Sequence, residues 1–253
     1  MADSGDPRAS IPRHDLLGVC VDAVTMDAAL DTIEASARNG VGCHVITLDA
    51  SMVVLASRDP ELRRIIQEAG LITPDSSGVL WAARRQGIRL PERVSGVEIV
   101  ARLAERSARS GVGLYFLGAA PGVAEEAADR LVRQWPGCRI VGFRDGYFAP
   151  EDEPRVVDAV RRAAPGVLCV GMGIPRQEKW IARWGGELGA PVMIGVGGTF
   201  DVLSGRVQRA PAWMQRQGLE WIHRLVRNPR KITKVMTLPR FVLMALSARR
   251  PEP

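Results

Sequence analysis

Cysteine and histidine are scarce in this sequence, and neither residue type is clustered. The chain has four cysteines and three histidines, with no Cys-x-x-Cys pair and no group at metal-ligand spacing. Three of the four cysteines lie in apolar stretches, which favours reduced core residues over disulfide or zinc-binding roles. The cysteines are Cys20, Cys43, Cys138 and Cys169, and the histidines are His14, His44 and His223. We therefore expect no metal site and no disulfide framework.

Long apolar runs are also absent. No run reaches the roughly 18 apolar residues that a transmembrane helix needs, and the N-terminus lacks the apolar core of a secretory signal peptide. We therefore expect the chain to be made and kept in the cytoplasm. Its 46% apolar and 25% charged residues are ordinary for a globular enzyme, and its 253 residues suffice for one large domain, or for one domain with an appendage.

Short apolar runs alternate with helical patterns along most of the chain, as is typical of parallel strands buried on both faces of a sheet. We expect strands at residues 16–21, 43–48, 71–73, 113–117, 138–143, 167–170 and 192–196. We expect helices at residues 25–38, 50–57, 61–69, 77–86, 97–109, 122–134, 151–163 and 176–184. The predicted fold class is therefore α/β, with a Rossmann-like parallel sheet flanked by helices.

The charges are unevenly distributed. From Arg206 to Arg250, eleven Lys or Arg accompany a single acid, a net charge of +10, whereas the whole chain carries +6 and the remainder therefore carries −4. The strand pattern stops near Ser204, which divides the chain into an α/β catalytic domain (1–204) and a basic amphipathic appendage (205–253). The interleaved apolar residues favour docking on an anionic membrane surface. A C-terminal helix packed on the domain, with a solvated basic face, explains the pattern equally well.

The most informative segment spans residues 168–224, and its first part can be interpreted from strand ends. An apolar run ends in Gly171 and Gly173, and a proline then opens a helix, since proline suits the first helical position. A second apolar run ends in two glycines and leads to Asp201. Glycines at strand ends let the backbone approach a ligand closely, and open α/β sheets bind ligands at the carboxyl ends of their strands. This segment therefore predicts a ligand site.

Polar residues also occur at strand ends earlier in the chain. Thr47 lies where the second expected strand runs out, and Asp75 follows a short strand that ends in proline. Arg93 lies in the segment Pro-Glu-Arg-Val-Ser-Gly (91–96). Local pattern alone also allows plain structural roles, as helix caps for Thr47 and Asp75 and as a surface charge for Arg93.

Two further positions come from the next strand-to-helix connections. Gly118, in Gly-Ala-Ala-Pro-Gly (118–122), fits either a nucleotide-handling loop or an ordinary tight turn. Tyr147, in Asp-Gly-Tyr-Phe (145–148), fits either the lining of a nucleotide pocket or simple packing.

Several of these motifs, in this order, resemble the WecG/TagA/CpsF glycosyltransferase family of bacteria. The motifs are Gly-Met-Gly-Ile-Pro-Arg-Gln-Glu-Lys-Trp (171–180), Gly-Val-Gly-Gly-Thr-Phe-Asp (195–201), Arg-Ala-Pro-Ala-Trp (209–213) and Gly-Leu-Glu-Trp-Ile-His-Arg-Leu (218–225). The resemblance runs from about Leu17 to Phe241. The family attaches a sugar from a nucleotide sugar to a lipid-linked acceptor during the synthesis of surface polysaccharides or teichoic acids.

The resemblance implies a role for each candidate residue. It implies that Asp75 is the catalytic base, with Thr47 as a second catalytic residue, and that Arg93 faces the diphosphate. It also implies that Gln177 forms a hydrogen bond with the donor sugar. The other substrate-binding residues that it implies are Asp49, which stands where the family usually has asparagine, Gly118, Tyr147, Gly173, Asp201, Arg224 and Lys231.

The resulting expectation is a metal-independent, inverting glycosyltransferase. The expected donor is a UDP-activated hexose, N-acetylhexosamine or uronic acid. The expected acceptor is a hydroxyl of a polyprenyl-diphosphate-linked sugar at the inner face of the plasma membrane. The sequence has no Asp-x-Asp motif, so Arg93, Arg224 and Lys231 are expected to neutralise the departing UDP. We expect no cofactor and no nucleic-acid partner, and the pattern leaves a homo-oligomer open.

Two other classes remain open on the pattern alone. A dinucleotide-dependent dehydrogenase would share the alternating sheet, but it should show Gly-x-Gly-x-x-Gly after the first strand. A non-catalytic nucleic-acid-binding protein would explain the basic appendage, but not the polar residues at several strand ends.

Overall fold

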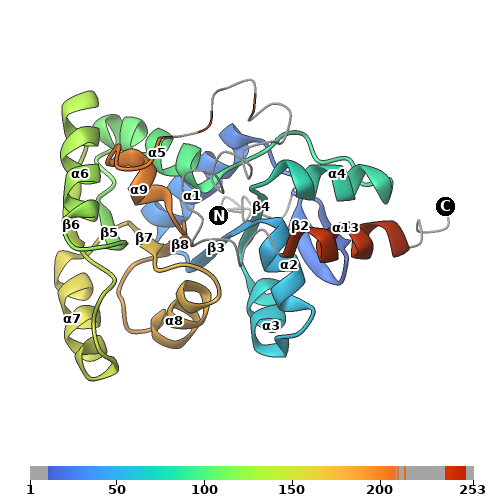
Figure 1. The fold of residues 1–253 in the computed structure, drawn as a ribbon. Helices are drawn as coiled ribbons and strands as arrows, with labels where there is room; N and C mark the ends of the chain where they lie inside the picture. The colour runs from blue at the N-terminus through green and yellow to red at the C-terminus, as the bar shows by residue number, and fades with distance from the viewer. Residues whose placement is uncertain (1–10, 209, 211–213, 215–236, 249–253) are drawn as a thin grey trace, which may run out of the picture.

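The computed structural model describes residues 11–208, 210, 214 and 237–248, and its centre is a six-stranded parallel sheet (Figure 1). The strand order is β4-β3-β8-β7-β5-β6. The strands are β3 (Cys43–Leu48), β4 (Leu71–Pro74), β5 (Leu114–Gly118), β6 (Ile140–Arg144), β7 (Val167–Gly171) and β8 (Val192–Gly195). The α/β, Rossmann-like fold class is confirmed, and six of the expected strands fall on these six.

The connections between strands are helical, as expected. The helices are α1 (Met26–Asn39), α2 (Ala50–Ala56), α3 (Pro60–Glu68), α4 (Ser77–Arg85), α5 (Gly96–Ser110), α6 (Val123–Gln134), the 3-10 turn η1 (Pro150–Asp152), α7 (Glu153–Ala163), α8 (Arg176–Trp184), α9 (Thr199–Leu203) and α13 (Thr237–Ser247). The expectation of one helix over residues 151–163 is corrected slightly, because its start is the turn η1. The short helix α9 was not expected.

The expected single strand at residues 16–21 is wrong. This segment instead forms an antiparallel hairpin of β1 (Arg13–Leu16) and β2 (Val19–Asp22). The chain reverses at Leu17 and Gly18, which have φ values of 58° and 83°. Positive φ at both central residues is what a tight hairpin turn requires. The turn could not be predicted from the apolar run, because leucine is common in strands and gives no turn signal.

The hairpin is fastened to the edge of the main sheet by a buried acid. The Asp22 carboxylate accepts a hydrogen bond from the backbone nitrogen of Ile72 on β4 at 2.7 Å. It also forms a two-point ion pair with Arg13, at 2.7 and 3.0 Å. Asp22 is only 2% exposed, so these contacts compensate for its lost hydration.

The core fills both faces of the sheet. On one face, strand residues pack against α1, α5, α6 and α9, with Phe116 stacking on Phe200 at a ring-centroid distance of 4.9 Å. On the other face, neighbouring residues such as Tyr115 and Leu117 pack against α7 and α8. The helices α2, α3, α4 and α13 cover the β3–β4 end together with the hairpin. Successive residues along a strand thus pack in the helical layers on opposite faces of the sheet.

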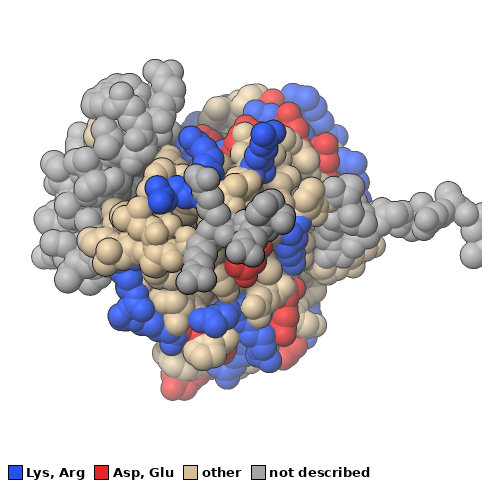
Figure 2. Space-filling view, turned by 90° about the vertical axis from the view of Figure 1, so that its right-hand side faces the viewer, with Lys and Arg blue, Asp and Glu red and all other residues tan. Residues whose placement is uncertain are grey.

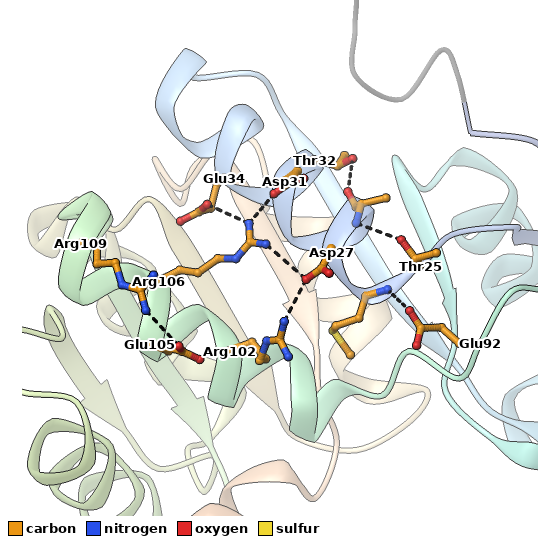
Figure 3. A network of polar contacts seen from close by, with 12 residues as sticks. Thr25, Asp27, Asp31, Thr32, Glu34, Glu92, Arg102, Glu105, Arg106 and Arg109 are labelled. Atoms are coloured by element: carbon orange, nitrogen blue, oxygen red, sulfur yellow. Dashed lines mark hydrogen bonds and ion pairs between the residues drawn. The ribbon is translucent and has the colours of Figure 1, made fainter.

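A network of ion pairs joins α1 to α5 (Figure 3). Arg106 on α5 contacts Asp27 at 3.6 Å, Asp31 at 2.5 Å and Glu34 at 3.2 Å. Arg102 contacts Asp27 at 2.9 Å. The three acids follow one another at the spacing of one helical turn, so they lie on one face of α1. The network therefore fixes the middle of α5 against α1.

The helix α13 packs on α2 and α4, so the described part of the appendage is docked on the domain. Phe241 and Ala245 are buried in the core between these helices. The opposite side of α13 exposes Val242, Leu243 and Leu246. Figure 2 views the molecule from the right-hand side of Figure 1, where Lys and Arg side chains lie beside uncharged areas. Packing of α13 on the domain does not decide between the two uses of the appendage, because the outward side of this helix is apolar and most of the basic residues lie outside the described residues.

Candidate active site

The ends of β3 and β4 bring two candidate residues to one edge of the sheet. Thr47 is paired with Thr73 in the parallel register, and Leu48 with Pro74. The backbone nitrogen of Asp75 then donates to the carbonyl of Leu48 at 2.9 Å. Asp75 therefore directly follows β4, beside the end of β3.

The carboxylate of Asp75 lies at the N-terminus of α5. Its Oδ1 atom accepts a hydrogen bond from the backbone nitrogen of Gly96, the first residue of that helix, at 3.2 Å. A helix N-terminus presents unpaired N–H groups and a positive dipole end, which stabilise negative charge. The cap of the following helix α4 is Ser76, whose hydroxyl accepts from Val79. The capping alternative for Asp75 is therefore wrong.

Thr47 contacts the same helix N-terminus. Its hydroxyl donates to the carbonyl of Gly195 on β8 at 2.8 Å, and the side chain is buried. A Cβ atom on Gly96 would lie 3.4 Å from Cγ2 of Thr47 and 3.5 Å from the hydroxyl of Thr199. Thr47 is thus an internal strand residue and not a helix cap. Thr199, at the start of α9, is a neighbour that the sequence patterns did not indicate.

Arg93 lies in the loop that leads into α5. Its guanidinium is 3.6 Å from Glu98, and the hydroxyl of Ser95 donates to the same carboxylate at 2.8 Å. The Arg93 side chain is 17% exposed, so it is held at the surface of the site by a defined partner. Glu98 was missed by sequence reasoning, although its position three residues after Ser95 is the spacing of a capping box.

Asp49 caps the helix that follows β3. Its Oδ1 atom accepts from the backbone nitrogen of Met52 at 2.8 Å and from the hydroxyl of Ser51 at 2.6 Å. These contacts fix the carboxylate at the N-terminus of α2. A part in substrate binding remains a prediction for Asp49.

A row of glycines lines the carboxyl ends of the other strands. Gly118 ends β5 with a φ of 138°, and a Cβ atom there would lie 2.4 Å from the carbonyl oxygen of Gly171 on β7. Gly171 in turn has no room for a Cβ atom, because the carbonyl oxygen of Gly197 would lie 2.8 Å away. A Cβ atom on Gly146, after β6, would lie 3.1 Å from the Cα atom of Gly118. The backbone along this edge is therefore closely packed, and Gly118 and Gly171 leave no room for a side chain of their own.

Three other candidates lie along this edge. Tyr147 follows β6 and is 76% exposed, so its ring is free to contact a ligand. Gly173 lies between β7 and α8, and Asp201 lies on α9 after β8. The structure thus places all three at or beyond carboxyl ends of strands, and their contacts with substrate remain predictions.

Gln177 is 2% exposed and bridges two loops. Its side-chain oxygen accepts hydrogen bonds from the backbone nitrogens of Gly173 and Gly197, each at 3.0 Å. Its amide nitrogen donates to Glu178 at 2.7 Å. The predicted contact between Gln177 and a donor sugar is untested, and any such contact has to be made by an amide that already has these three partners.

The two cationic candidates of the appendage, Arg224 and Lys231, lie outside the described residues. At the start of the appendage, Arg206 forms a two-point ion pair with Glu126 on α6, at 2.7 and 2.6 Å. Nearby, Arg130 donates to the carbonyl of Ser204 at 2.8 Å. These contacts attach the chain to α6 at the point where the appendage begins.

A partly buried histidine lies in the same strand as Thr47. His44 is on β3, and its Nε2 atom is buried without a hydrogen-bond partner among the described residues. Burial lowers the pKa of His44 to about 4, because the charged imidazolium would lose its hydration. His44 is therefore neutral at physiological pH. Among the described residues, no three His, Cys, Asp or Glu side chains form a cluster that could hold a metal ion.

The fold and the site together define a class of protein. A parallel sheet flanked by helices, with polar side chains and glycines at the carboxyl ends of its strands, defines a Rossmann-like α/β protein, and this edge is where such sheets bind ligands. The chain belongs to the WecG/TagA/CpsF glycosyltransferase family, whose model matches residues 14–253. It is therefore a glycosyltransferase, and the dehydrogenase alternative is set aside.

Two curated relatives are N-acetylglucosaminyldiphosphoundecaprenol N-acetyl-β-D-mannosaminyltransferases. The protein from Bacillus spizizenii (strain W23) is 31% identical over 209 residues, which cover 83% of this chain and 80% of the relative. The protein from Bacillus subtilis (strain 168) is also 31% identical, over 206 residues that cover 81% of this chain and 80% of the relative. The similarity thus extends over most of both chains.

Proposed function

We propose that this glycosyltransferase moves a sugar, with inversion, from a UDP-sugar to a hydroxyl of a polyprenyl-diphosphate-linked sugar in cell-surface polysaccharide synthesis. The observation that carries the proposal is the Asp75 carboxylate at the N-terminus of α5, beside Thr47 and near the loop of Arg93. The activity for which the two relatives are named supports N-acetylmannosamine as the first donor sugar to test. It also supports N-acetylglucosaminyl-diphosphoundecaprenol as the first acceptor.

The proposed chemistry needs one base and several cations. Asp75 takes the proton of the acceptor hydroxyl while that oxygen forms its bond to the anomeric carbon. The bond from the anomeric carbon to UDP breaks, and UDP leaves with the electron pair. Thr47 helps to shape the site through its contact with the first turn of α5. Arg93 faces the diphosphate, since a guanidinium can bind two phosphate oxygens at once.

We propose that the charge on the departing UDP is neutralised without a metal ion. Arg93 supplies one cation, and Arg224 and Lys231 of the appendage supply two more. The choice of possible metal ligands supports this proposal. The sequence lacks an Asp-x-Asp motif, and the described residues contain no cluster of His, Cys, Asp or Glu side chains suited to a metal ion. Gly118, Tyr147 and Asp201 are proposed to line the nucleotide end of the site. Gly173, Gln177 and Asp49 are proposed to line the sugar end.

We also propose that the protein works at the inner face of the plasma membrane, as a peripheral protein. No helix among the described residues is long and apolar enough to cross a membrane. The outward side of α13 exposes Leu243 (66%) and Leu246 (51%), which suit insertion at the level of the lipid headgroups. Basic residues of the appendage add attraction to anionic lipids, about 1 kcal/mol for each residue near the surface. Arg206 is not counted among them, because Glu126 already pairs with it.

Ligand binding by the purified full-length protein tests the proposed class of substrate. Titration calorimetry with UDP, NAD and a short oligonucleotide separates the nucleotide-sugar proposal from the two other classes considered for this sequence. We expect saturable binding of UDP alone. Binding of NAD or the oligonucleotide in place of UDP would contradict the proposal.

A further inference from the structure

The first turn of α8 presses two polar side chains against β8. Gln177 is 2% exposed and Glu178 is fully buried. A Cβ atom on Gly195 would lie 2.7 Å from the amide nitrogen of Gln177 and 2.8 Å from Oε1 of Glu178. The pair thus occupies space that exists only because position 195 is a glycine. Burial of an acid at this depth is rare unless hydrogen bonds compensate for its lost hydration.

The hydrogen bonds of the pair fix the orientation of the Gln177 amide. Its oxygen faces two backbone N–H donors, those of Gly173 and Gly197. Its nitrogen faces the Glu178 carboxylate at 2.7 Å. The reverse orientation would place the NH2 group against two N–H donors and the carbonyl oxygen against a carboxyl oxygen. Only one orientation of the Gln177 amide therefore allows all three hydrogen bonds. In that orientation, the Glu178 carboxylate accepts the hydrogen bond from the amide nitrogen.

The orientation matters because Gln177 connects two loops of the ligand edge. Gly173 belongs to the loop between β7 and α8, and Gly197 to the loop between β8 and α9. The carbonyl of Gly195, the last residue of β8, also accepts the hydrogen bond of Thr47. A single glutamine amide thus ties the ends of β7 and β8 together, next to the strand that carries Thr47.

We propose that Glu178 is a positioning residue for the donor site. By accepting one hydrogen bond, it holds the Gln177 amide in the orientation that joins the two loops, and so fixes the backbone on which the UDP-sugar rests. The inference builds on the proposed function, since it needs a donor that binds at this edge. It assigns Glu178 no contact with substrate and no part in proton transfer. The site requires only that residue 178 place an acceptor oxygen within hydrogen-bond distance of the Gln177 amide nitrogen.

Two substitutions at position 178 separate the effect of the position of the acceptor oxygen from the effect of the carboxylate charge. Glu178→Gln keeps an oxygen at the same distance from the Gln177 amide but removes the carboxylate charge. Glu178→Asp keeps the charge but withdraws the oxygen by one methylene. We expect Glu178→Asp to raise the KM for the UDP-sugar about tenfold or more, because the hydrogen bond that orients Gln177 is lost. We expect Glu178→Gln to rescue the donor KM to within about threefold of wild type. The acceptor KM should change little in either variant.

The experiment is a set of steady-state measurements on the full-length protein, with donor and acceptor varied separately and with thermal unfolding as a check on folding. A double-substitution cycle with Gln177→Met adds a second readout, because a residue that acts only through Gln177 has no further effect once Gln177 is gone.

Three results would each overturn the inference: a wild-type donor KM in Glu178→Asp, a tenfold rise of the donor KM in Glu178→Gln, or additive effects with Gln177→Met. If Glu178→Asp does not fold, the result for Glu178→Gln still decides. Wild-type protein that binds no UDP-sugar would overturn the proposed function instead.

Discussion

The Oδ1 atom of Asp75 lies 3.2 Å from the backbone nitrogen of Gly96, so the end of β4 and the first residue of α5 meet at one carboxylate. The two residues are 21 positions apart in the chain. A Cβ atom at position 96 would lie within van der Waals distance of Thr47 and Thr199, so both threonines neighbour this helix end. The candidate base is therefore held at the N-terminus of α5.

Asp75→Asn is expected to keep the fold and UDP binding while lowering kcat by roughly 100-fold or more, since loss of a general base typically costs 10²–10⁴. The amide can still accept the Gly96 hydrogen bond through its oxygen, but it cannot take a proton from the acceptor. Steady-state kinetics and UDP titration of the variant measure both effects. Asp129→Asn, on the exposed side of α6, is the matched control. Near-wild-type turnover of Asp75→Asn would remove Asp75 from the mechanism.

Gly118→Ala is expected to lower the free energy of unfolding by about 2 kcal/mol or more and to weaken UDP binding. The new methyl group would meet the carbonyl oxygen of Gly171 at 2.4 Å, and the φ of 138° disfavours any side chain. Chemical denaturation and UDP titration measure the two losses. Gly186→Ala is the control, because a Cβ atom there has no neighbour within 4 Å. Equal stability of the two variants would show that the glycine row is not closely packed.

His44→Leu is expected to reduce the acid sensitivity of the fold. The folded-state pKa of His44 is lowered to about 4, so between pH 6.5 and 4 the unfolded chain binds a proton that the folded chain does not. Wild-type stability should therefore fall over this window by up to about 3 kcal/mol more than that of the variant. Urea denaturation at pH 7.5 and pH 4.5 gives the comparison. An equal loss of stability on acidification in the two proteins would mean that His44 is not the responsible group.

Replacing Leu243 and Leu246 together by Gln is expected to weaken binding to anionic vesicles about tenfold or more, since two large apolar side chains no longer enter the lipid. Both residues face away from the core, whereas Phe241 and Ala245 on the same helix are buried, so the fold should persist. Sedimentation with vesicles that contain phosphatidylglycerol measures the effect. Val132→Gln, an exposed apolar site on α6, is the control. Unchanged sedimentation of the double variant would show that α13 does not dock the protein.

Much of the fold could be predicted from the sequence because its signals are local. The helix from Met26 to Asn39 begins after Thr25, whose hydroxyl accepts from Ala28 as a cap residue should, and ends at a left-handed glycine. Strand β3 coincides with its apolar run at residues 43–48. The hairpin at Leu17 and the short helix α9 could not be predicted in this way. A leucine with positive φ looks like a strand residue, and five helical residues are too few for a periodic pattern.

The candidate site could be predicted less completely, because its contacts join distant parts of the chain. Asp75 could be placed at a strand end, yet its partner Gly96 depends on how α5 crosses that edge. Gln177 could be recognised by its motif, but its three hydrogen bonds depend on the spacing of β7 and β8. Glu178 belongs to the same motif, but its burial could not be predicted, since an acid on the first turn of a helix ordinarily faces solvent.

The most direct measurement of the central claim is UDP release by the full-length protein, with and without a lipid-linked acceptor. The first pair to test is UDP-N-acetylmannosamine with N-acetylglucosaminyl-diphosphoundecaprenol, followed by other UDP-sugars on the same acceptor. We predict UDP release that requires both substrates and yields a lipid-linked disaccharide, detected by mass spectrometry. No UDP release with any pair, or release at the same rate without acceptor, would contradict the assignment of this site to sugar transfer onto a polyprenyl-linked acceptor.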